Sequence, residues 1–461
     1  MAQQARKIVV IDDDPTGSQT VHSCPLLLRW DPDSLATGLA HPSPLLFVLA
    51  NTRALAPVQA RQRVQEICQA LKPALAHLAS RGMGWLVVSR GDSTLRGHYP
   101  LEVDTIAAEL GPFDATLLVP AFLEGGRTTV NSVHRLHGRP VHESAFARDR
   151  LFGYRTSHLP DWVAEKSDGR IAANAVQRLA LADLEEGGAA LRERLAGFSG
   201  NVTVVVDAEH PRHLGALGAA VRELGDPHTG QRWGRPRRFL FQSAASLLNG
   251  LADLPPPPLE AAALARLRRR DDTGRAAPGL VLVGSHVPLA DAQLERLLAE
   301  PGCGGVEIPV RRVQRVLEGP LPDRLLASLE AEWLAALQQR LAAGLTPVLY
   351  TSRGEERCRH ATERRTLGLA LATAMARLAA QLAPRLGYVI SKGGITSQTL
   401  LADGLGLTQV ELQGQLLPGL SLVLAGHGGA PGAAGLPVLT LPGNLGEATT
   451  LLETWKRLEA G

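Results

Sequence analysis

The chain is poor in several features, and each shortage narrows what it can be. Only four cysteines occur in 461 residues and none forms a C-x-x-C pair, so neither a zinc knuckle nor a disulfide framework is indicated. Scattered thiols of this kind are typical of a reducing compartment, and we predict a cytoplasmic protein. No run of about 18 apolar residues appears, so no membrane span is expected. The N-terminus also lacks the apolar stretch of a signal peptide.

The chain also lacks a strong charge of either sign. Its formal net charge is +3, and the one dense cationic run covers residues 266–270. We therefore expect a small-molecule partner and no nucleic acid. The basic residues are nearly all arginines, because only five lysines occur, so Lys392 stands out inside a glycine-rich motif. The oligomeric state stays open, with a homo-oligomer as one option.

Short apolar segments alternate with amphipathic ones along the chain. In the first half this predicts strands at 8–11, 26–29, 45–49, 85–89, 116–119 and 202–206, and helices at 57–79 and 214–224. In the second half it predicts strands at 279–283, 348–351, 388–391, 420–424 and 438–441, and helices at 323–343 and 360–383. Such alternation is typical of parallel βαβ units. A proline- and arginine-rich stretch interrupts it, so we predict two α/β domains with largely parallel sheets, 1–250 and 279–461, joined by a linker at 251–278.

Three consecutive aspartates follow the strand predicted at 8–11 and lead into a Pro-Thr-Gly-Ser turn. In an open α/β sheet, ligands bind just past the carboxyl ends of strands. Asp12, Asp13 and Asp14 repel one another there. A metal, a cationic side chain or a substrate hydroxyl should therefore compensate their charge.

Two further polar clusters follow predicted strands, at 89–98 and 124–129. Together they contain Arg90, Asp92, Ser93, Arg96 and Arg127. Arginine presents a planar fork that binds a carboxylate in two places, and aspartate accepts hydrogen bonds from hydroxyls. This sheet edge therefore predicts a site for a small polyhydroxylated acid. The structural alternative is that these residues cap a helix and form ion pairs.

Three histidines, His134, His137 and His142, lie close in the sequence. Their spacing matches no helical i, i+4 pair, so we expect a surface loop there, with a metal site as the alternative.

The second half contains turns of small residues between strands and helices. They are Gly284-Ser285-His286, Ser391-Lys392-Gly393-Gly394-Ile395-Thr396 and Pro442-Gly443-Asn444-Leu445-Gly446. A glycine turn before a helix presents free N–H groups that favour phosphate. Neither a Walker A loop nor G-x-G-x-x-G is present. The three turns therefore resemble a nucleotide-binding site of another kind. The loop 426–432 could line that site or could be merely a flexible connection.

Taken together, these motifs resemble those of the four-carbon acid sugar kinase family, over nearly the whole chain. The N-terminal motifs are Asp-Asp-x-Thr-Gly at 13–17, Asp-Ser-Thr-Leu-Arg-Gly at 92–97 and Gly-Arg-Thr at 126–128. The C-terminal ones are Gly-Ser at 284–285, Gly-Gly at 393–394 and Gly-Asn-Leu-Gly at 443–446. The chain departs from the family pattern at Pro15, where leucine is common, and at Lys392, where threonine is familiar.

The resemblance implies an ATP- and Mg²⁺-dependent kinase that phosphorylates threonate, erythronate or 3-oxo-tetronate, with the active site in the cleft between an acid-binding and a nucleotide-binding domain. In such a kinase, our hypothesis is that Asp14 or Asp13 accepts the proton of the attacking hydroxyl. The acid pocket would contain Asp13, Asp14, Arg90, Asp92, Ser93, Arg96 and Arg127. The contacts to ATP would come from Ser285, Lys392, Gly393, Gly394, Ile395, Thr396, Gly443 and Asn444.

Two other readings stay open. Asp12-x-Asp14-x-Thr16 also fits haloacid-dehalogenase-type phosphatases, with Asp12 as nucleophile and Asp14 as acid and base. That family also needs a strand-end acidic pair, and none is evident. A non-catalytic protein that binds sugar acids is the third reading. The sequence leaves open the acid, its stereochemistry, the hydroxyl phosphorylated and any role for Asp12.

Overall fold

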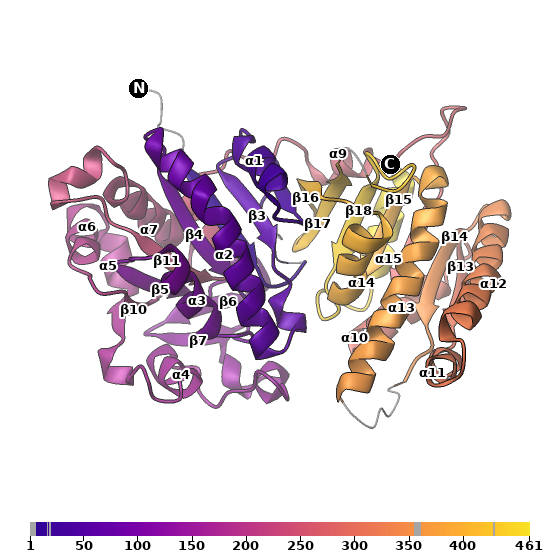
Figure 1. Cartoon of the computed structure of the whole chain (residues 1–461), viewed down its shortest axis with the longest axis horizontal. Helices are drawn as coiled ribbons and strands as arrows, with labels where there is room; N and C mark the ends of the chain where they lie inside the picture. Colours follow the sequence, from indigo (N-terminus) through magenta and orange to yellow (C-terminus); the bar gives the residue numbers. More distant parts are fainter. Residues whose placement is uncertain (1–5, 16, 18–19, 355–360, 427–428) are drawn as a thin grey trace. The chain divides into compact units, whose positions relative to one another are not determined.

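The computed structural model describes residues 6–15, 17, 20–354, 361–426 and 429–461. Its contacts divide the chain into two compact α/β units, residues 1–256 and 257–461, called here the first and second unit (Figure 1). The division falls within the linker predicted at 251–278.

The first unit is built on a parallel sheet with strand order β2-β3-β1-β4-β11-β5-β10-β9. The strands are β1 (Lys7–Asp12), β2 (Cys24–Leu27), β3 (Leu45–Leu49), β4 (Trp85–Arg90), β5 (Ala115–Val119), β9 (Gln177–Leu179), β10 (Val202–Val206) and β11 (Phe239–Ser243). Strand β1 is buried along its whole length, as expected of a parallel strand covered on both faces. The sequence did not lead us to expect β11, which lies between β4 and β5.

Helices cover this sheet. They are α1 (Pro32–Ala40), α2 (Pro57–Ser80), α3 (Leu101–Leu110), α4 (Leu159–Lys166), α5 (Leu181–Glu186), α6 (Gly188–Ala196), α7 (Pro211–Leu224) and α8 (Ser246–Ala252). Val9 and Ile11 of β1 share one hydrophobic core with Leu35 of α1 and Ile67 of α2, and α2 crosses this face of the sheet (Figure 1). Pro57 suits the first turn of α2, where its missing N–H would have no partner anyway.

A small antiparallel sheet corrects the prediction of a surface loop around His134. It consists of β6 (Arg127–Val130), β7 (Val133–Leu136) and β8 (Arg139–Pro140). His134 lies on β7 and is completely buried. Its Nδ1 lies 2.9 Å from the hydroxyl of Thr129, and its Nε2 donates to the carbonyl of Ser93 at 2.8 Å. Burial lowers the pKa of His134 to about 4, so its imidazole is neutral. It joins β6 to the segment that contains Ser93 by hydrogen bonds.

The second unit has the strand order β13-β14-β12-β15-β18-β17-β16, parallel from β13 to β18 and antiparallel beyond. The strands are β12 (Gly279–Val283), β13 (Cys303–Ile308), β14 (Thr346–Thr351), β15 (Tyr388–Lys392), β16 (Gln409–Leu417), β17 (Leu420–Ala425) and β18 (Pro437–Leu441). The helices are α9 (Ala261–Ala265), α10 (Pro288–Leu298), α11 (Val310–Glu318), α12 (Pro322–Ala342), α13 (Ala361–Leu382), α14 (Gly394–Thr399) and α15 (Thr450–Ala460).

Each unit has a topological switch point beside its first strand. Strand β1 pairs with β3 on one side and with β4 on the other, and β12 likewise pairs with β14 and β15. The following connections therefore leave in opposite directions, which opens a crevice at the carboxyl ends of the strands. The motifs noted in the sequence lie at these ends.

One helical stretch among the described residues, Glu363–Arg385, is long and apolar enough to cross a membrane. Its apolar window is 56% buried inside the structure. Because a core helix passes the same test, this is weak evidence for a membrane span.

Candidate functional site

The three aspartates have very different surroundings. Asp12 is completely buried, whereas the side chains of Asp13 and Asp14 are 2% and 19% exposed. Oδ1 of Asp12 accepts the N–H of Asp14 at 3.3 Å. A Cβ at Gly17 would lie 2.1 Å from that same oxygen, so only glycine lets the turn close over Asp12. Thr16 and Ser18 lie outside the described residues.

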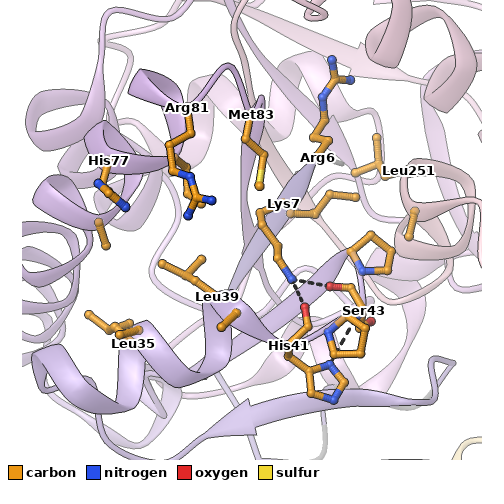
Figure 2. A pocket seen from close by; sticks show the side chains of 18 of the residues that line it. Arg6, Lys7, Leu35, Leu39, His41, Ser43, His77, Arg81, Met83 and Leu251 are labelled. Carbon is orange, nitrogen blue, oxygen red and sulfur yellow. Dashed lines mark hydrogen bonds between the residues drawn. The ribbon is translucent and has the colours of Figure 1, made fainter. Parts of the chain in front are cut away.

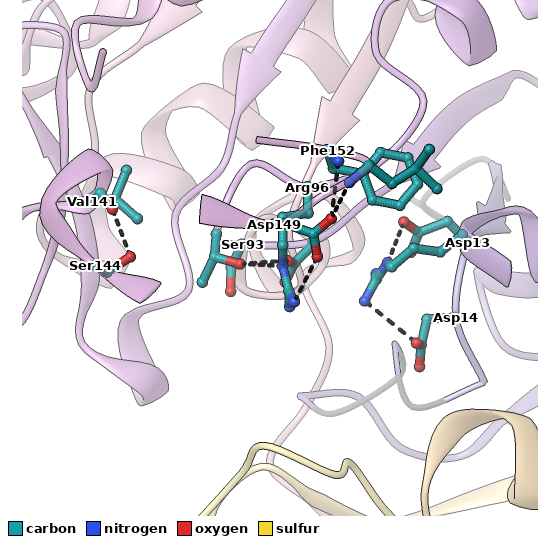
Figure 3. A network of polar contacts seen from close by, with 12 residues as sticks. Asp13, Asp14, Ser93, Arg96, Val141, Ser144, Asp149 and Phe152 are labelled. Atoms are coloured by element: carbon teal, nitrogen blue, oxygen red, sulfur yellow. Dashed lines mark hydrogen bonds and ion pairs between the residues drawn. The ribbon is translucent and has the colours of Figure 1, made fainter. Parts of the chain in front are cut away.

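An arginine that we did not single out from the sequence compensates much of this charge. Arg53 donates to both carboxylate oxygens of Asp13, from Nε at 3.0 Å and from Nη2 at 2.5 Å. Its Nη1 donates to Oδ2 of Asp14 at 3.3 Å (Figure 3). Arg53 lies in the short 3-10 turn Thr52–Ala54 after β3, just past Asn51, which has a positive φ of 49°. Of the three partners that the sequence suggested for the aspartates, the structure thus provides the cationic side chain.

Arg90 supplies a second guanidinium from the end of β4. Its Nη1 lies 3.5 Å from Asp12 Oδ1 and 3.6 Å from Asp13 Oδ1, and its side chain is 5% exposed. Burial raises the pKa of Asp12 to about 7, although Arg90 lowers it. Burial also raises the pKa of Asp13, against the opposing effect of Arg53. Asp12 therefore takes up a proton more readily than an exposed aspartate does.

Glu102 of α3 adds a third buried carboxyl group beside Asp12 and Asp13. It accepts the hydroxyl of Thr52, and burial together with the charge of Asp13 raises its pKa to about 8. The imidazole of His98 lies 3.1 Å from each of the carbonyls of Thr52 and Leu55. The turn that carries Arg53 is therefore fixed by side chains on both sides of it.

The loop after β4 holds the predicted pair Asp92 and Arg96, which bind each other. Nε of Arg96 donates to Asp92 Oδ2 at 2.7 Å, and the hydroxyl of Thr94 donates to the same oxygen. Burial acts to raise the pKa of Asp92, but Arg53 and Arg96 outweigh it and hold the pKa below its usual range. Nη1 of Arg96 lies 3.9 Å from Asp149 (Figure 3).

Glycines bring this loop against Asp13. A Cβ at Gly97 would lie 3.5 Å from Asp13 Oδ2, and one at Gly91 would lie 3.9 Å from it. Gly97 also has a φ of 138°, which side chains disfavour. Ser93 is buried in this loop, with its carbonyl held by His134.

Arg127 has a buried N–H donor without a hydrogen-bond partner among the described residues. This donor is Nε, whereas Nη1 donates to the carbonyl of Gly125 at 2.7 Å. The guanidinium carbon lies 5.5 Å from the centre of the Phe122 ring, and burial lowers the pKa of Arg127. A buried donor without a partner costs about 1–3 kcal/mol, which an anionic ligand could recover.

In the second unit, the predicted glycine turns pack directly against one another. A Cβ at Gly284 would lie 2.1 Å from Oγ1 of Thr396, and one at Gly443 would lie 2.5 Å from Oγ of Ser285. Gly393 has a φ of 119°, and its N–H donates to the carbonyl of Leu441 at 2.9 Å. Three turns, from β12, β15 and β18, thus meet with their backbones close together.

The other predicted residues of these turns differ in exposure. Lys392 is completely buried, and its Nζ donates to the carbonyl of Pro442 at 3.1 Å. Burial lowers the pKa of Lys392 to about 8, and its ammonium holds the 442–446 turn from within the protein. Ile395 is 50% exposed, and Asn444 is also exposed. Gly394 begins α14.

A second arginine that we did not single out, Arg353, braces the first of these turns. Its Nη1 donates to the carbonyl of Ser285 and to Asp291, both at 2.8 Å. Its Nη2 donates to the hydroxyl of Thr351 at 2.7 Å. Arg353 and Arg53 share one sequence signal, since each is a polar residue shortly after a buried apolar strand.

The described residues include no group of three or more His, Cys, Asp or Glu side chains placed to hold a metal ion. At the aspartate run, Arg53 and Arg90 occupy positions beside the carboxylates that a cation would otherwise need.

Comparisons with known proteins cover both units. Residues 8–251 match the family model of a sugar-binding N-terminal domain, and residues 280–451 match that of a nucleotide-binding C-terminal domain. The chain is 28% identical to a D-threonate kinase of Cupriavidus necator over 80% of this chain and 78% of that protein. It is 25% identical to a D-threonate kinase of Salmonella typhimurium over 98% of both. A D-erythronate kinase of Heliobacterium modesticaldum is 28% identical, over 46% of this chain and about half (47%) of that protein.

Two solved structures share the fold. A protein of Salmonella typhimurium matches with a TM-score of 0.63 at 19% identity, over 97% of this chain and 98% of that one. A Haemophilus influenzae protein from a family of unknown function matches with a TM-score of 0.59 at 18% identity, over 98% and 99%. With its sugar-binding and nucleotide-binding domains in this order, the chain belongs to the four-carbon acid sugar kinase family.

Proposed function

We propose that this chain is an ATP-dependent kinase that phosphorylates a hydroxyl of a four-carbon sugar acid, with D-threonate and D-erythronate as the first candidates. One observation carries the proposal: Arg53 binds Asp13 and Asp14 at the switch point of the sugar-binding unit. The glycine turns at the corresponding point of the nucleotide-binding unit support it, and so do the names of the relatives.

Arg127 is the proposed partner of the substrate carboxylate. Its Nε is buried without a partner among the described residues, whereas Arg96 is already bound to Asp92. A carboxylate placed against Arg127 would receive charge-assisted hydrogen bonds, which are about twice as strong as neutral ones. Asp92 and Ser93 would then face the hydroxyls of the acid.

Asp14 is the proposed acceptor of the hydroxyl proton. It is more exposed than Asp13, whose two oxygens are both occupied by Arg53. Kinases rely mainly on positioning and charge neutralisation, and an aspartate that orients the hydroxyl and takes its proton is a recurring part of such sites.

The convergent turns at Gly284, Gly393 and Gly443 fit a triphosphate, because bare backbone can approach phosphate oxygens closely. Val287 and Ile395 are 37% and 50% exposed and offer apolar surface for a base. ATP supplies the phosphoryl group, and its Mg²⁺ is usually held by phosphates, water and one or two carboxylates, so a dedicated cluster is not required. In this reaction the sugar-binding unit would hold the acid and the nucleotide-binding unit would hold ATP, and we place the protein in the cytoplasm.

The burial of Asp12 argues against the phosphatase reading. A nucleophile must reach the phosphorus atom, but Asp12 is completely buried and its Oδ1 accepts the N–H of Asp14. We therefore give Asp12 the role of ordering the aspartate turn.

A coupled assay of ADP release tests the proposal, with D- and L-threonate, D- and L-erythronate and 3-oxo-tetronate as acceptors. We expect ADP release that depends on one or a few of these acids. Release of phosphate from the phosphorylated acids without ATP would instead favour a phosphatase. Binding of an acid without any ADP release would favour a non-catalytic binding protein.

A further inference from the structure

A large cavity lies at the other end of the first unit's sheet, where β1 begins. Its volume is about 1120 Å³, and it is bounded by α1, α2 and the segments 41–44 and 251–255. Strand β1 separates it from the aspartates, and its six residues span roughly 20 Å at 3.3 Å per residue. The cavity is therefore distinct from the proposed acid site.

The walls of the cavity are largely apolar. Leu35 and Leu39 of α1, Leu78 of α2 and Met83 line it. Figure 2 labels Leu35, Leu39 and Met83. Small-molecule sites are typically concave, a few hundred to about 1,000 Å³ in volume, apolar and equipped with a few polar groups. This cavity has those properties.

The charged groups of the lining are nearly all cationic. Arg6, Lys7, Arg81 and Arg222 line the cavity, against the single carboxylate of Asp253. That carboxylate lies 3.9 Å from Nη2 of Arg222, so it already faces a cation. The lining thus favours an anion.

Lys7 is the strongest indication that the cavity binds an anion. Its side chain is 5% exposed, and its ammonium donates to the carbonyls of Ser43, at 2.6 Å, and His41 (Figure 2). Burial lowers the pKa of Lys7, and no carboxylate of the described residues offsets this. An ammonium has three N–H donors, so one remains after these two bonds. Because buried charges are normally paired, Lys7 lacks the anion that its position calls for.

We propose that this cavity binds a small amphipathic anion, with one carboxylate or sulfonate at Lys7 and an aliphatic or aromatic body between α1 and α2. The proposal rests on the first unit alone and does not depend on the kinase activity.

Isothermal titration calorimetry with three probes of equal chain length tests it, using the full chain without ATP or sugar acid. Octanoate should bind with a stoichiometry of one, and octan-1-ol at least about tenfold more weakly, because it lacks the charge that strengthens the hydrogen bond. Octylammonium should not bind. Equal affinities for octanoate and octan-1-ol, or no binding of octanoate, would overturn the proposal.

Two variants locate the binding. Ala36→Trp places a large side chain on the cavity face of α1 and should abolish octanoate binding. Its matched control is Thr37→Trp, on the adjacent exposed position that does not line the cavity, and this variant should bind normally. Lys7→Met should weaken octanoate at least about tenfold while leaving octan-1-ol unchanged. Octanoate binding that survives Ala36→Trp would show that it binds elsewhere and would contradict the proposal.

Discussion

The two switch points of this chain contain different chemical groups. At β1 and β4, buried carboxyl groups face the guanidinium groups of Arg53 and Arg90. At β12 and β15, glycine backbones pack against hydroxyl groups, and the buried Lys392 donates to the carbonyl of Pro442. The first site can select and orient a ligand by its charge and can exchange a proton with it. The second site selects a ligand by how closely the backbone can approach it. Changes of charge at the first site and changes of shape at the second should therefore affect different ligands.

The largest effect is expected from Asp14→Asn. Loss of the proposed proton acceptor should lower kcat about 10²- to 10⁴-fold, the usual contribution of a general base. The KM for ATP should change little, because the site in the nucleotide-binding unit is untouched. Initial rates at varied ATP measure both constants. Asp33→Asn, an exposed position in α1, is the control, and an unchanged kcat in Asp14→Asn would remove Asp14 from the mechanism.

Arg53→Gln tests the charge balance of the first site through stability. It leaves Asp13 buried without the bidentate hydrogen bonds from Arg53. Breaking a buried ion pair costs about 3–5 kcal/mol of unfolding free energy. Urea denaturation measures the loss. Arg170→Gln breaks a pair with Asp104 in which both side chains are largely exposed, so it should cost no more than about 1 kcal/mol. Equal losses in the two variants would mean that Arg53 contributes no more than a surface pair.

Gly284→Ala tests the shape of the second site. The new Cβ would meet Thr396 at 2.1 Å, and overpacking of this kind costs about 1–3 kcal/mol. If that strain falls on the nucleotide site, the KM for ATP rises roughly 10- to 100-fold, while the KM for the acid stays the same. Gly368→Ala makes the same change in α13, where nothing lies within 4 Å of the added carbon, and should be neutral. A rise in the KM of the acid alone would reverse the assignment of the two units.

The last effect concerns pH. Because the pKa of Glu102 is raised to about 8, the folded state holds a proton that the unfolded state loses near pH 4 to 5. The unfolding free energy should therefore fall as pH rises from 5 to 8. Glu102→Gln keeps a side-chain oxygen that can accept the hydroxyl of Thr52 but cannot titrate, so it should be less sensitive to pH. Urea midpoints at pH 5 and pH 8 measure the difference, and identical pH dependence in both proteins would show that Glu102 does not titrate in this range.

Much of this arrangement could be predicted from local sequence. The β-branched run at 8–11 predicts a buried strand, and strand ends in an α/β fold gather at one edge. The position of Asp12 beside Arg90 could therefore be predicted. The helices predicted at 57–79, 323–343 and 360–383 are confirmed to within a residue or two, because their length and period leave little ambiguity.

The misses share a cause, which is that side-chain partners depend on distant segments. Arg53 acts on Asp13 only because Asn51 turns the chain after β3, and no motif marks that turn. His134 is buried where it bridges Thr129 and the loop after β4, although its own strand is only four residues long. Lys392 stood out as a cation in a glycine-rich turn, but it is completely buried and donates to the carbonyl of Pro442.

The most direct measurement is the identity of the phosphorylated product. Phosphorus-31 NMR of a reaction with ATP and the most active acid should show one phosphate monoester of the acid for each ADP formed. Asp14→Asn should form the same product far more slowly. Inorganic phosphate in place of the monoester, or loss of phosphate from the phosphorylated acid in the absence of ATP, would contradict the account.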